Sequence, residues 1–362
     1  MRHVGANPGR SGHRLSIEAG RILIETREAL AELFQIEDPL RICFAKNATE
    51  ALNLAILGRL RFGDHCITSS MEHNSVMRPL RALEKGGVEV TIIPCSPHGE
   101  LNPQEVEKVI KKNTRLIVIT HASNVVGTLM PITEVGKIAR DNGIPLCIDA
   151  AQSAGAYPID VKKMNVDLLA FTGHKSLCGP QGTGGLYIRE GLEERLEPLM
   201  RGGTGSRSEF QEQPDFIPDK YESGTPNTVG LAGLGAGVRF CLAQGVARIR
   251  QKEQQMTQQL IDGLQSIPGV CLYGCGDAER QVAICSFAII GLSPSEITME
   301  LDEEFAIMSR PGLHCAPAAH QTIGTFPQGT VRLSAGYFTT EDDITFALEA
   351  VGKIAARSRK LR

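Results

Sequence analysis

The stretch Ile144-Pro-Leu-Cys-Ile-Asp149-Ala-Ala-Gln152 decides the predicted fold. Its first five residues are apolar, and a short apolar run of this kind predicts a strand that is buried on both faces. Such a strand belongs inside a parallel sheet that is covered by helices. It ends in the carboxylate of Asp149, and the carboxyl ends of parallel strands form the crevice in which α/β sheets bind ligands. A buried carboxylate needs a partner there, although Asp149 is also suited to cap a following helix.

Similar apolar segments recur along the first two hundred residues and alternate with amphipathic ones. The predicted strands span residues 41–45, 65–69, 88–93, 115–120, 144–149, 167–171 and 183–188. Helix start signals lie between several of them, such as Asn102-Pro103 followed by Glu105. Repeated strand–helix–strand units predict an α/β fold with a mainly parallel sheet covered by helices.

The pattern changes after about residue 200. Residues 201–227 are rich in Gly, Ser, Pro and charge, which predicts an irregular loop. A long helical region over 229–267, bent near Gly245, is followed by strand-like segments at 270–273 and 283–290 and by two further helices. We therefore predict a large α/β domain over residues 1–235 and a smaller α+β domain over residues 236–362.

Composition limits the class of protein. The 362 residues include 38 Lys and Arg against 41 Asp and Glu, a net charge of −3 that argues against nucleic acid as the main partner. No membrane span and no secretory signal are predicted, because apolar runs are short and the first residues are polar. Ten cysteines are too few for a disulfide scaffold. We expect free thiols in the reducing cytoplasm.

A second strand end carries a lysine. The strand predicted at 167–171 leads into Thr172-Gly-His174-Lys175. A lysine held in a cleft is desolvated, which lowers the pKa of its ammonium and yields the free amine that forms Schiff bases. Taken alone, a loop lysine in a salt bridge is the better explanation.

Other strand ends carry polar residues that point to the same crevice. His73 follows the strand at 65–69 and is able to stack on a flat ring, and Asn124 follows the strand at 115–120 and is able to donate to a ring oxygen. Asn47-Ala48-Thr49-Glu50 has the spacing of a helix start, which is a site for a phosphate. An amine, a buried carboxylate, a ring, an amide and a phosphate site together match what pyridoxal 5'-phosphate needs.

In these motifs the sequence resembles the class V aminotransferase family of fold-type I pyridoxal-phosphate enzymes. The resemblance rests on Ser123-Asn124-Val-Val-Gly127-Thr128, Asp149-Ala-Ala-Gln152 and Thr172-Gly-His174-Lys175, which occur in the family's order. It implies that Lys175 forms the Schiff base with the cofactor and that Asp149 binds the pyridinium nitrogen. It also implies contacts to the rest of the cofactor: stacking by His73, bonds to the ring oxygen from Asn124 and Gln152, and phosphate binding by Ala48, Thr49, Thr172 and His174.

The segment Glu222-Ser-Gly-Thr225-Pro-Asn227 resembles one that donates a Thr to the neighbouring subunit's phosphate in this family. The resemblance therefore implies a homodimer with shared active sites, in which Thr225 binds cofactor. The chain opens almost directly on Gly5-Ala-Asn-Pro-Gly-Arg-Ser-Gly-His13. In the family a short strand and helix precede this motif and place small residues near the substrate, so we expect their absence to affect activity but not the cofactor site.

One cysteine lies in a distinctive loop, Ser309-Arg310-Pro-Gly312-Leu-His314-Cys315-Ala-Pro317. Positive neighbours lower the pKa of a thiol, and here these would be Arg310 and His314. The motif resembles the catalytic loop of the SUF-type (group II) cysteine desulfurases and selenocysteine lyases. By that resemblance Lys175, with His73 as a relay, removes a proton from L-cysteine, Cys315 takes the sulfur as a persulfide, and L-alanine leaves.

The same resemblance extends to the substrate and to the fate of the sulfur. Arg332, in Gly329-Thr-Val-Arg332-Leu-Ser334-Ala-Gly-Tyr337, would bind the substrate carboxylate, with Arg310 as a second candidate and Asn124 beside them. A sulfur-acceptor protein or a reductant would then discharge the persulfide for sulfur metabolism. L-selenocysteine is an alternative substrate. A different class V lyase or aminotransferase, or a non-catalytic sulfur carrier, are the other interpretations that stay open.

The remaining features carry less specific predictions. Residues 318–328 are polar with Gly and Pro, which predicts a flexible lid. His314, Cys315 and His320 are three potential ligands in one loop without a fourth, which is weak evidence for zinc, so no metal is predicted. Small residues over 233–237 indicate close helix packing. Seven cysteines are predicted to pack among helices and strands, whereas Cys178 and Cys275 lie in loops without a motif.

Overall fold

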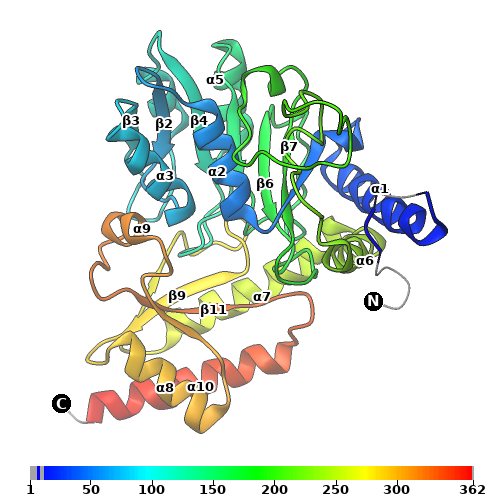
Figure 1. The fold of residues 1–362 in the computed structure, drawn as a ribbon. Helices are drawn as coiled ribbons and strands as arrows, with labels where there is room; N and C mark the ends of the chain where they lie inside the picture. Colours follow the sequence, from blue (N-terminus) through cyan, green and yellow to red (C-terminus); the bar gives the residue numbers. More distant parts are fainter. Residues whose placement is uncertain (1–5, 9–11, 361–362) are drawn as a thin grey trace.

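A seven-stranded sheet forms the centre of the computed structural model, which describes residues 6–8 and 12–360 (Figure 1). The strand order is β1-β7-β6-β5-β4-β2-β3. All neighbouring pairs are parallel except those of β7, which is antiparallel to both β1 and β6. The strands are β1 (Ile42–Ala45), β2 (His65–Ser69), β3 (Glu89–Ile93), β4 (Thr114–Thr120), β5 (Leu146–Asp149), β6 (Leu168–Thr172) and β7 (Gly184–Ile188). The mixed α/β architecture with a mainly parallel sheet confirms the predicted fold class.

The central strands are buried on both faces, as predicted for the stretch around Asp149. Alternate side chains point to opposite sides, so that Ile117 and Ile148 enter one apolar core while Val118 and Cys147 enter the other. The first core also receives α1 (Arg14–Phe34), α4 (Pro103–Lys108), α5 (Ile132–Asp141) and α6 (Thr228–Gln244). The second core receives α2 (Ala48–Arg59) and α3 (Asn74–Glu84). Each strand therefore ends between two helical layers.

A second, antiparallel sheet lies below the first (Figure 1). Its order is β10-β11-β9-β8. It consists of β8 (Val270–Tyr273), β9 (Ile284–Ile289), β10 (Arg310–Gly312) and β11 (Thr330–Ser334), and it packs with α7 (Val246–Ser266), α8 (Pro294–Phe305) and α10 (Glu341–Lys360) around a core of its own. A capping box formed by Ser293 and Glu296 starts α8, one of the two further helices predicted in this region.

The long helical region bends as predicted. Helices α6 and α7 meet at Gly245, whose φ of 80° is readily adopted by glycine, and their axes differ by 80°. Position 235 lies inside α6, and the division into domains at that residue stays a prediction. Gly237 confirms the predicted close packing, because a Cβ there would lie 2.2 Å from the carbonyl oxygen of Leu177. Among the described residues no single helix meets the length and apolarity of a membrane span, and only the bent pair α6–α7 does so when taken together.

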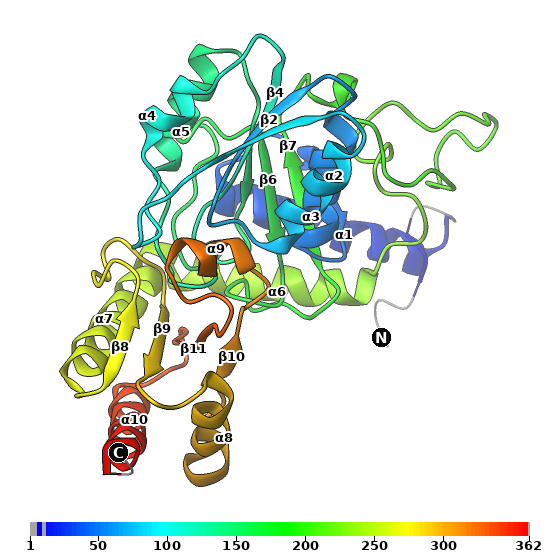
Figure 2. The same cartoon turned by 90° about the vertical axis from the view of Figure 1, so that its left-hand side faces the viewer.

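The lid predicted at residues 318–328 is wrong. This region begins with α9 (Pro317–Thr322), which lies beside α3 in two views (Figures 1 and 2). Ala319 and Ile323 are buried in the first core of the large sheet, and the Thr322 hydroxyl donates to the carbonyl oxygen and the hydroxyl of Ser70. Polar composition hid two buried apolar side chains at helical spacing, so the segment is packed rather than free.

Candidate active site

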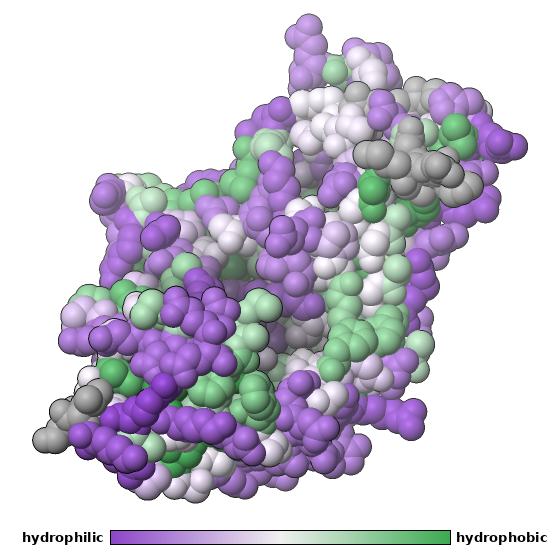
Figure 3. All heavy atoms as spheres, turned by 90° about the horizontal axis from the view of Figure 1, so that it is seen from below, coloured by the Kyte–Doolittle hydropathy of each residue, from purple (hydrophilic) through white to green (hydrophobic). Residues whose placement is uncertain are grey.

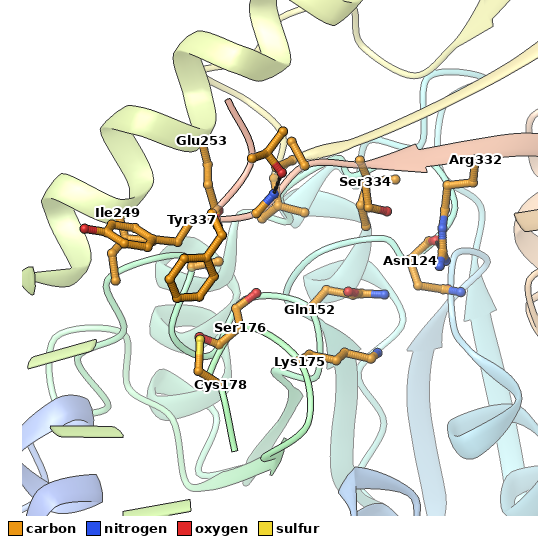
Figure 4. A pocket seen from close by; sticks show the side chains of 18 of the residues that line it. Asn124, Gln152, Lys175, Ser176, Cys178, Ile249, Glu253, Arg332, Ser334 and Tyr337 are labelled. Atoms are coloured by element: carbon orange, nitrogen blue, oxygen red, sulfur yellow. Dashed lines mark hydrogen bonds between the residues drawn. The ribbon is translucent and has the colours of Figure 1, made fainter. Parts of the chain in front are cut away.

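A cavity of about 430 Å³ lies between the carboxyl ends of the large sheet's strands and the second sheet. The side chains around it come from both parts of the chain (Figure 4). From below, the molecular surface is hollowed near its middle between hydrophilic and hydrophobic areas (Figure 3). Six of the predicted site residues line the cavity: His73, Asn124, Gln152, Lys175, Arg310 and Arg332. Sequence positions up to 259 residues apart are thus brought together, His73 to Arg332.

Lys175 extends into this cavity from the turn that follows β6 (Figure 4). The turn is fixed by its backbone, because the Gly173 N–H donates to Thr183 and the Cys178 N–H donates to the Lys175 carbonyl. Burial lowers the pKa of the Lys175 ammonium; Asp149 opposes this shift, and the two nearby arginines add to it. The side chain remains accessible from the cavity, so its amine is both reachable and easily deprotonated.

Asp149 ends β5 with its side chain 5% exposed. One carboxylate oxygen accepts a 2.9 Å bond from the Ala151 N–H, and among the described residues no hydrogen bond reaches the other oxygen. The alternative role as a helix cap is wrong, since residues 150–157 form turns rather than a helix. The carboxylate of Asp149 partly opposes the effect of burial on the pKa values of both His73 and Lys175, because its negative charge favours their protonated forms. A cationic group placed beside Asp149 would be stabilised in the same way.

His73 is the N-cap of α3 and is neutral at physiological pH, because burial lowers the pKa of its ring. Its Nδ1 accepts from the Ser75 N–H at 3.0 Å, so the proton of the neutral ring is carried on Nε2. The Ser75 hydroxyl lies 2.8 Å from Nδ1 and 2.7 Å from the hydroxyl of Thr49. Ser75, which the sequence did not single out, therefore connects the predicted stacking ring to the predicted phosphate site.

The predicted phosphate residues lie outside the lining of the cavity, at the start of α2 and the end of β6. Asn47 caps α2 by accepting from the Glu50 N–H, and no acceptor among the described residues takes the N–H groups of Ala48 and Thr49. At the end of β6 the hydroxyl of Thr172 lies 2.9 Å from Nδ1 of His174. Free N–H groups at a helix start and hydroxyl groups nearby are the donor set that binds a phosphate.

Thr225 lies apart from the other predicted residues. It is exposed in the long loop over 201–227, which contains no helix or strand, as predicted. The base of this loop is anchored by Glu222, whose carboxylate accepts two 2.6 Å bonds from Arg27 and one from the Phe44 N–H. The loop thus presents Thr225 outward from a fixed base.

Cys315 is held near the cavity by the backbone of its own loop. The Asn74 N–H donates to the Cys315 carbonyl at 2.8 Å, and the Asn124 side chain donates to the His314 carbonyl at 2.7 Å. Both His314 and Cys315 have positive φ, 50° and 60°, a conformation that side chains rarely adopt. The result is an exposed thiol to which the Arg310 guanidinium donates at 3.4 Å.

The prediction that His314 is a positive neighbour of the thiol is wrong. Its ring is buried, with Nε2 3.1 Å from the Thr330 hydroxyl, and burial together with nearby cations lowers its pKa to about 3. His320 is also buried and neutral, with a pKa lowered to about 4. Among the described residues no three His, Cys, Asp or Glu side chains gather as a metal would require. The positive charge beside the Cys315 thiol therefore comes from Arg310.

Arg310 and Arg332 face each other across β10 and β11 as paired residues. Arg332 donates to the Asn124 carbonyl at 2.8 Å, while its buried Nε has no partner among the described residues. Burial and the second guanidinium lower the pKa of Arg332 to about 10, so it keeps its charge at neutral pH. Two adjacent cations with unused donors form a site for a small carboxylate.

Sequence reasoning missed two buried carboxyl groups. Glu72 is fully buried beside His73: one oxygen accepts from the Ser69 hydroxyl and the Thr120 N–H, and the other has no partner among the described residues. Burial, with Asp149 adding to it, raises the pKa of Glu72 to about 8. Glu253 of α7 lines the cavity, and burial raises its pKa to about 7. The signal for Glu72 was its place directly after a buried strand.

All ten cysteines are free thiols. Five of the seven predicted to pack are buried, but Cys271 is exposed on β8, the last strand of the second sheet, which corrects that prediction. Cys178 is exposed and lines the cavity. Exposure alone therefore leaves three thiols, Cys178, Cys271 and Cys315, of which Cys315 is the one that receives a bond from a guanidinium.

Comparisons with known proteins show the family to which the chain belongs. The family model for aminotransferase class-V matches residues 1–346. A probable cysteine desulfurase of Methanothermobacter thermautotrophicus is 37% identical over 98% of this chain and 89% of the relative, and one of Pyrococcus abyssi is 34% identical over 94% and 84%. The apo structure of a cysteine desulfurase from Thermococcus onnurineus NA1 matches with a TM-score of 0.91 and 34% identity, covering 97% of this chain and 88% of that one. The chain belongs to the aminotransferase class-V family.

Proposed function

We propose that this chain is a pyridoxal-phosphate-dependent cysteine desulfurase that converts L-cysteine into L-alanine and retains the sulfur as a persulfide on Cys315. Relatives and a solved structure bearing the name cysteine desulfurase support the reaction class. One observation carries the assignment to Cys315: this exposed thiol accepts a bond from Arg310, and Asn124 holds the carbonyl of the residue before it, while both Arg310 and Asn124 line the cavity that contains Lys175.

The residues present fit the cofactor. Asp149 offers a buried carboxylate oxygen without a hydrogen bond among the described residues, which suits a protonated ring nitrogen. The helix start at Ala48 and Thr49 would hold the phosphate together with Thr172 and His174, and Gln152 and Asn124 line the cavity where they would meet the ring. When bound, the cofactor supplies the electron sink that makes the α-proton of an amino acid acidic.

The two arginines of the second sheet orient the substrate. The carboxylate of L-cysteine binds at Arg332, whose guanidinium offers a planar pair of donors. Arg310 lies opposite Arg332 on β10 and also donates to the Cys315 thiol. It therefore holds the attacking sulfur close to the site of the substrate carboxylate. This arrangement directs the substrate's own thiol toward Cys315.

Lys175 moves the proton. Burial lowers the pKa of its ammonium, which favours the neutral amine, and this amine takes the α-proton of the substrate. His73 is neutral and carries its proton on Nε2, so it is suited to stack and to pass a proton but not to add charge. The carboxylate of Asp149 stabilises positive charge that develops beside it.

Cys315 takes the sulfur. Its thiolate attacks the substrate sulfur and forms an S–S bond while the bond between that sulfur and Cβ breaks. The electron pair of the broken bond stays with the carbon skeleton, which is protonated and leaves as L-alanine. Arg310 stabilises the thiolate before the attack.

Two further parts of the proposal concern the surroundings of the enzyme. Thr225 is exposed on an anchored loop, and α1 exposes the apolar side chains of Leu15, Ile17 and Ile24, which supports a homodimer in which Thr225 reaches the partner's phosphate site. Ten free thiols support a reducing, cytoplasmic location.

The variant Cys315→Ala tests the proposal, assayed for sulfide release from L-cysteine with Cys178→Ala as the matched control. We expect Cys315→Ala to lose sulfide release by about 10²-fold or more and Cys178→Ala to keep it. Sulfide release at the wild-type rate in Cys315→Ala would overturn the role of this thiol. Selenide release from L-selenocysteine at the wild-type rate by Cys315→Ala would indicate a selenocysteine lyase that does not need the thiol. Amino-group transfer to a keto acid by the wild-type enzyme would indicate another class V reaction.

A further inference from the structure

A second hollow, of about 400 Å³, is lined by residues of α3 and α9. These two helices lie close together in Figure 2. We call this hollow the α3–α9 groove. Its apolar surface includes Met77 from α3 and Pro317 and Ala318 from α9. Helix α9 is held in place by the bonds from Thr322 to Ser70, so the groove is a fixed feature of the fold. The shape and apolar lining suit an extended or helical peptide segment.

The edge of the groove is positively charged. Arg78, Arg81 and Lys85 line it at helical spacing along one side of α3, and all three side chains are exposed. Arg81 pairs with Glu84, whereas Arg78 and Lys85 form no ion pair among the described residues. The groove therefore keeps an unneutralised charge of about +2 on a chain whose net charge is −3.

The groove adjoins the loop that carries the reactive thiol. Asn74, one of its lining residues, donates its backbone N–H to the Cys315 carbonyl. Pro317, on the opposite wall, follows Cys315 by two residues. A partner bound in the groove would therefore lie against the loop that carries the sulfur.

We propose that the α3–α9 groove docks an acidic segment of the protein that accepts the sulfur, a proposal that rests on the proposed function. Carboxylates of this segment meet Arg78, Arg81 and Lys85, and its apolar side chains cover Met77 and Pro317. The acceptor's cysteine thiolate attacks the outer sulfur of the Cys315 persulfide. A new S–S bond forms on the acceptor, the S–S bond at Cys315 breaks, and Cys315 leaves as a thiolate without net oxidation or reduction.

Charge favours such a partner over a nucleic acid or a membrane. Both of those would meet the negative charge of the whole chain over a wide surface, whereas the cations here are confined to one side of a narrow apolar groove. Exposed charges at the rim of an interface act mainly on association, so the effect of the groove should weaken as salt rises.

The test compares two short synthetic peptides as acceptors of sulfur from the Cys315 persulfide. Each carries a single cysteine, flanked by glutamates in one peptide and by glutamines in the other. At low salt we expect the glutamate peptide to discharge the persulfide about five- to tenfold faster. The triple variant Arg78→Gln, Arg81→Gln, Lys85→Gln should lose this advantage, and the wild type should lose it at high salt. Dithiothreitol should discharge the persulfide equally in all proteins.

The matched control removes the same charge elsewhere: Lys108→Gln at the end of α4, and Lys111→Gln and Lys112→Gln in the loop before β4, at the opposite end of the strands from the site. It should keep the advantage. Equal rates for both peptides on the wild type, or an advantage that survives in the α3 triple variant, would overturn the proposal. The single variant Lys85→Glu, at the exposed end of α3, should reduce the rate advantage of the glutamate peptide as well. This variant tests the groove even if the triple variant does not fold.

A binding measurement separates this proposal from the proposed function. The glutamate peptide with serine in place of its cysteine, labelled with a fluorophore, reports docking by anisotropy without any sulfur chemistry. Binding to the wild type that is lost in the α3 triple variant supports the groove even if no persulfide forms on Cys315. Binding of equal strength to both proteins would overturn it, whatever the enzyme's activity.

Discussion

The two walls of the active-site cavity are built in different ways. The wall that would hold the cofactor consists of residues at the ends of parallel strands, such as Asp149 and Lys175, whose backbones are fixed within or next to a buried sheet. The opposite wall carries Arg310 and Arg332 and continues into a turn in which His314 and Cys315 both have positive φ. Two hydrogen bonds from Asn74 and Asn124 tie this turn to the first wall. The difference matches the two tasks: a cofactor needs a rigid site, whereas a sulfur carrier has to present its sulfur to a second molecule.

The rigid wall predicts the largest loss. Lys175→Ala removes the amine that takes the α-proton, and we expect sulfide release to fall by about 10³-fold or more. The bound cofactor's visible absorbance should disappear as well, which spectroscopy of the purified protein checks. Lys163→Ala, which changes an exposed lysine on the surface, is the control. Wild-type absorbance in Lys175→Ala would contradict the assignment.

The next largest effect should separate the paired arginines. Arg332→Lys keeps the charge but loses the planar pair of donors, so we expect KM for L-cysteine to rise about 10- to 100-fold with a smaller change in kcat. Arg310→Lys should raise KM less, because this residue also serves the thiol. Steady-state kinetics of both variants decides this, and a larger rise in KM for Arg310→Lys would reverse the two roles.

Glu72 predicts a pH effect on stability within the rigid wall. Its pKa rises from the ordinary 4.5 to about 8 on folding, so between these values the folded state keeps a proton that the unfolded state has released. Glu72 therefore lowers stability as pH rises from about 5 to 8. Relative to wild type, Glu72→Gln should gain about 3 kcal/mol in unfolding free energy between pH 5 and pH 8. Urea unfolding at both pH values measures this, and a parallel dependence in the two proteins would show that Glu72 is ionised in the fold.

The smallest predicted effect concerns the turn that carries Cys315. Arg310→Gln removes the charged donor to the Cys315 thiolate, so alkylation of Cys315 by iodoacetamide near pH 7 should slow about three- to tenfold. Cys178 is also exposed and serves as an internal control whose alkylation rate should not change. Peptide mapping after timed alkylation follows both thiols. An equal slowing at Cys178 would point to a general change in the fold.

The same contrast explains what the sequence was able to predict. Apolar runs with a polar residue at the end located β5, β6 and the residues that follow them, because strand periodicity and the geometry of parallel sheets are local rules. The second wall was predicted less well. His314 is bonded to Thr330, and α9 is held by a bond from Thr322 to Ser70. Both contacts join residues that are separated in the sequence, so a local pattern does not predict them.

The clearest error and the clearest omission have related causes. Proximity in sequence suggested that His314 supports the Cys315 thiol, but positive φ at both residues turns the histidine ring inward. Glu72 was overlooked although it adjoins His73, because its importance comes from its burial and from the charge of Asp149, which ends β5, two strands away from β2 in the sheet. In both cases the direction and surroundings of a side chain decided its role, and neither follows from the order of residues.

The most direct test of the account locates the sulfur after a single turnover. The wild-type enzyme is incubated with L-cysteine without a reductant, and the cysteine-containing peptides are analysed by mass spectrometry. We predict one additional sulfur atom on the peptide that contains Cys315, in proportion to the L-alanine formed, and none on those containing Cys178 or Cys271. L-Alanine formed with the sulfur on another cysteine, or on none, would contradict the central role of Cys315.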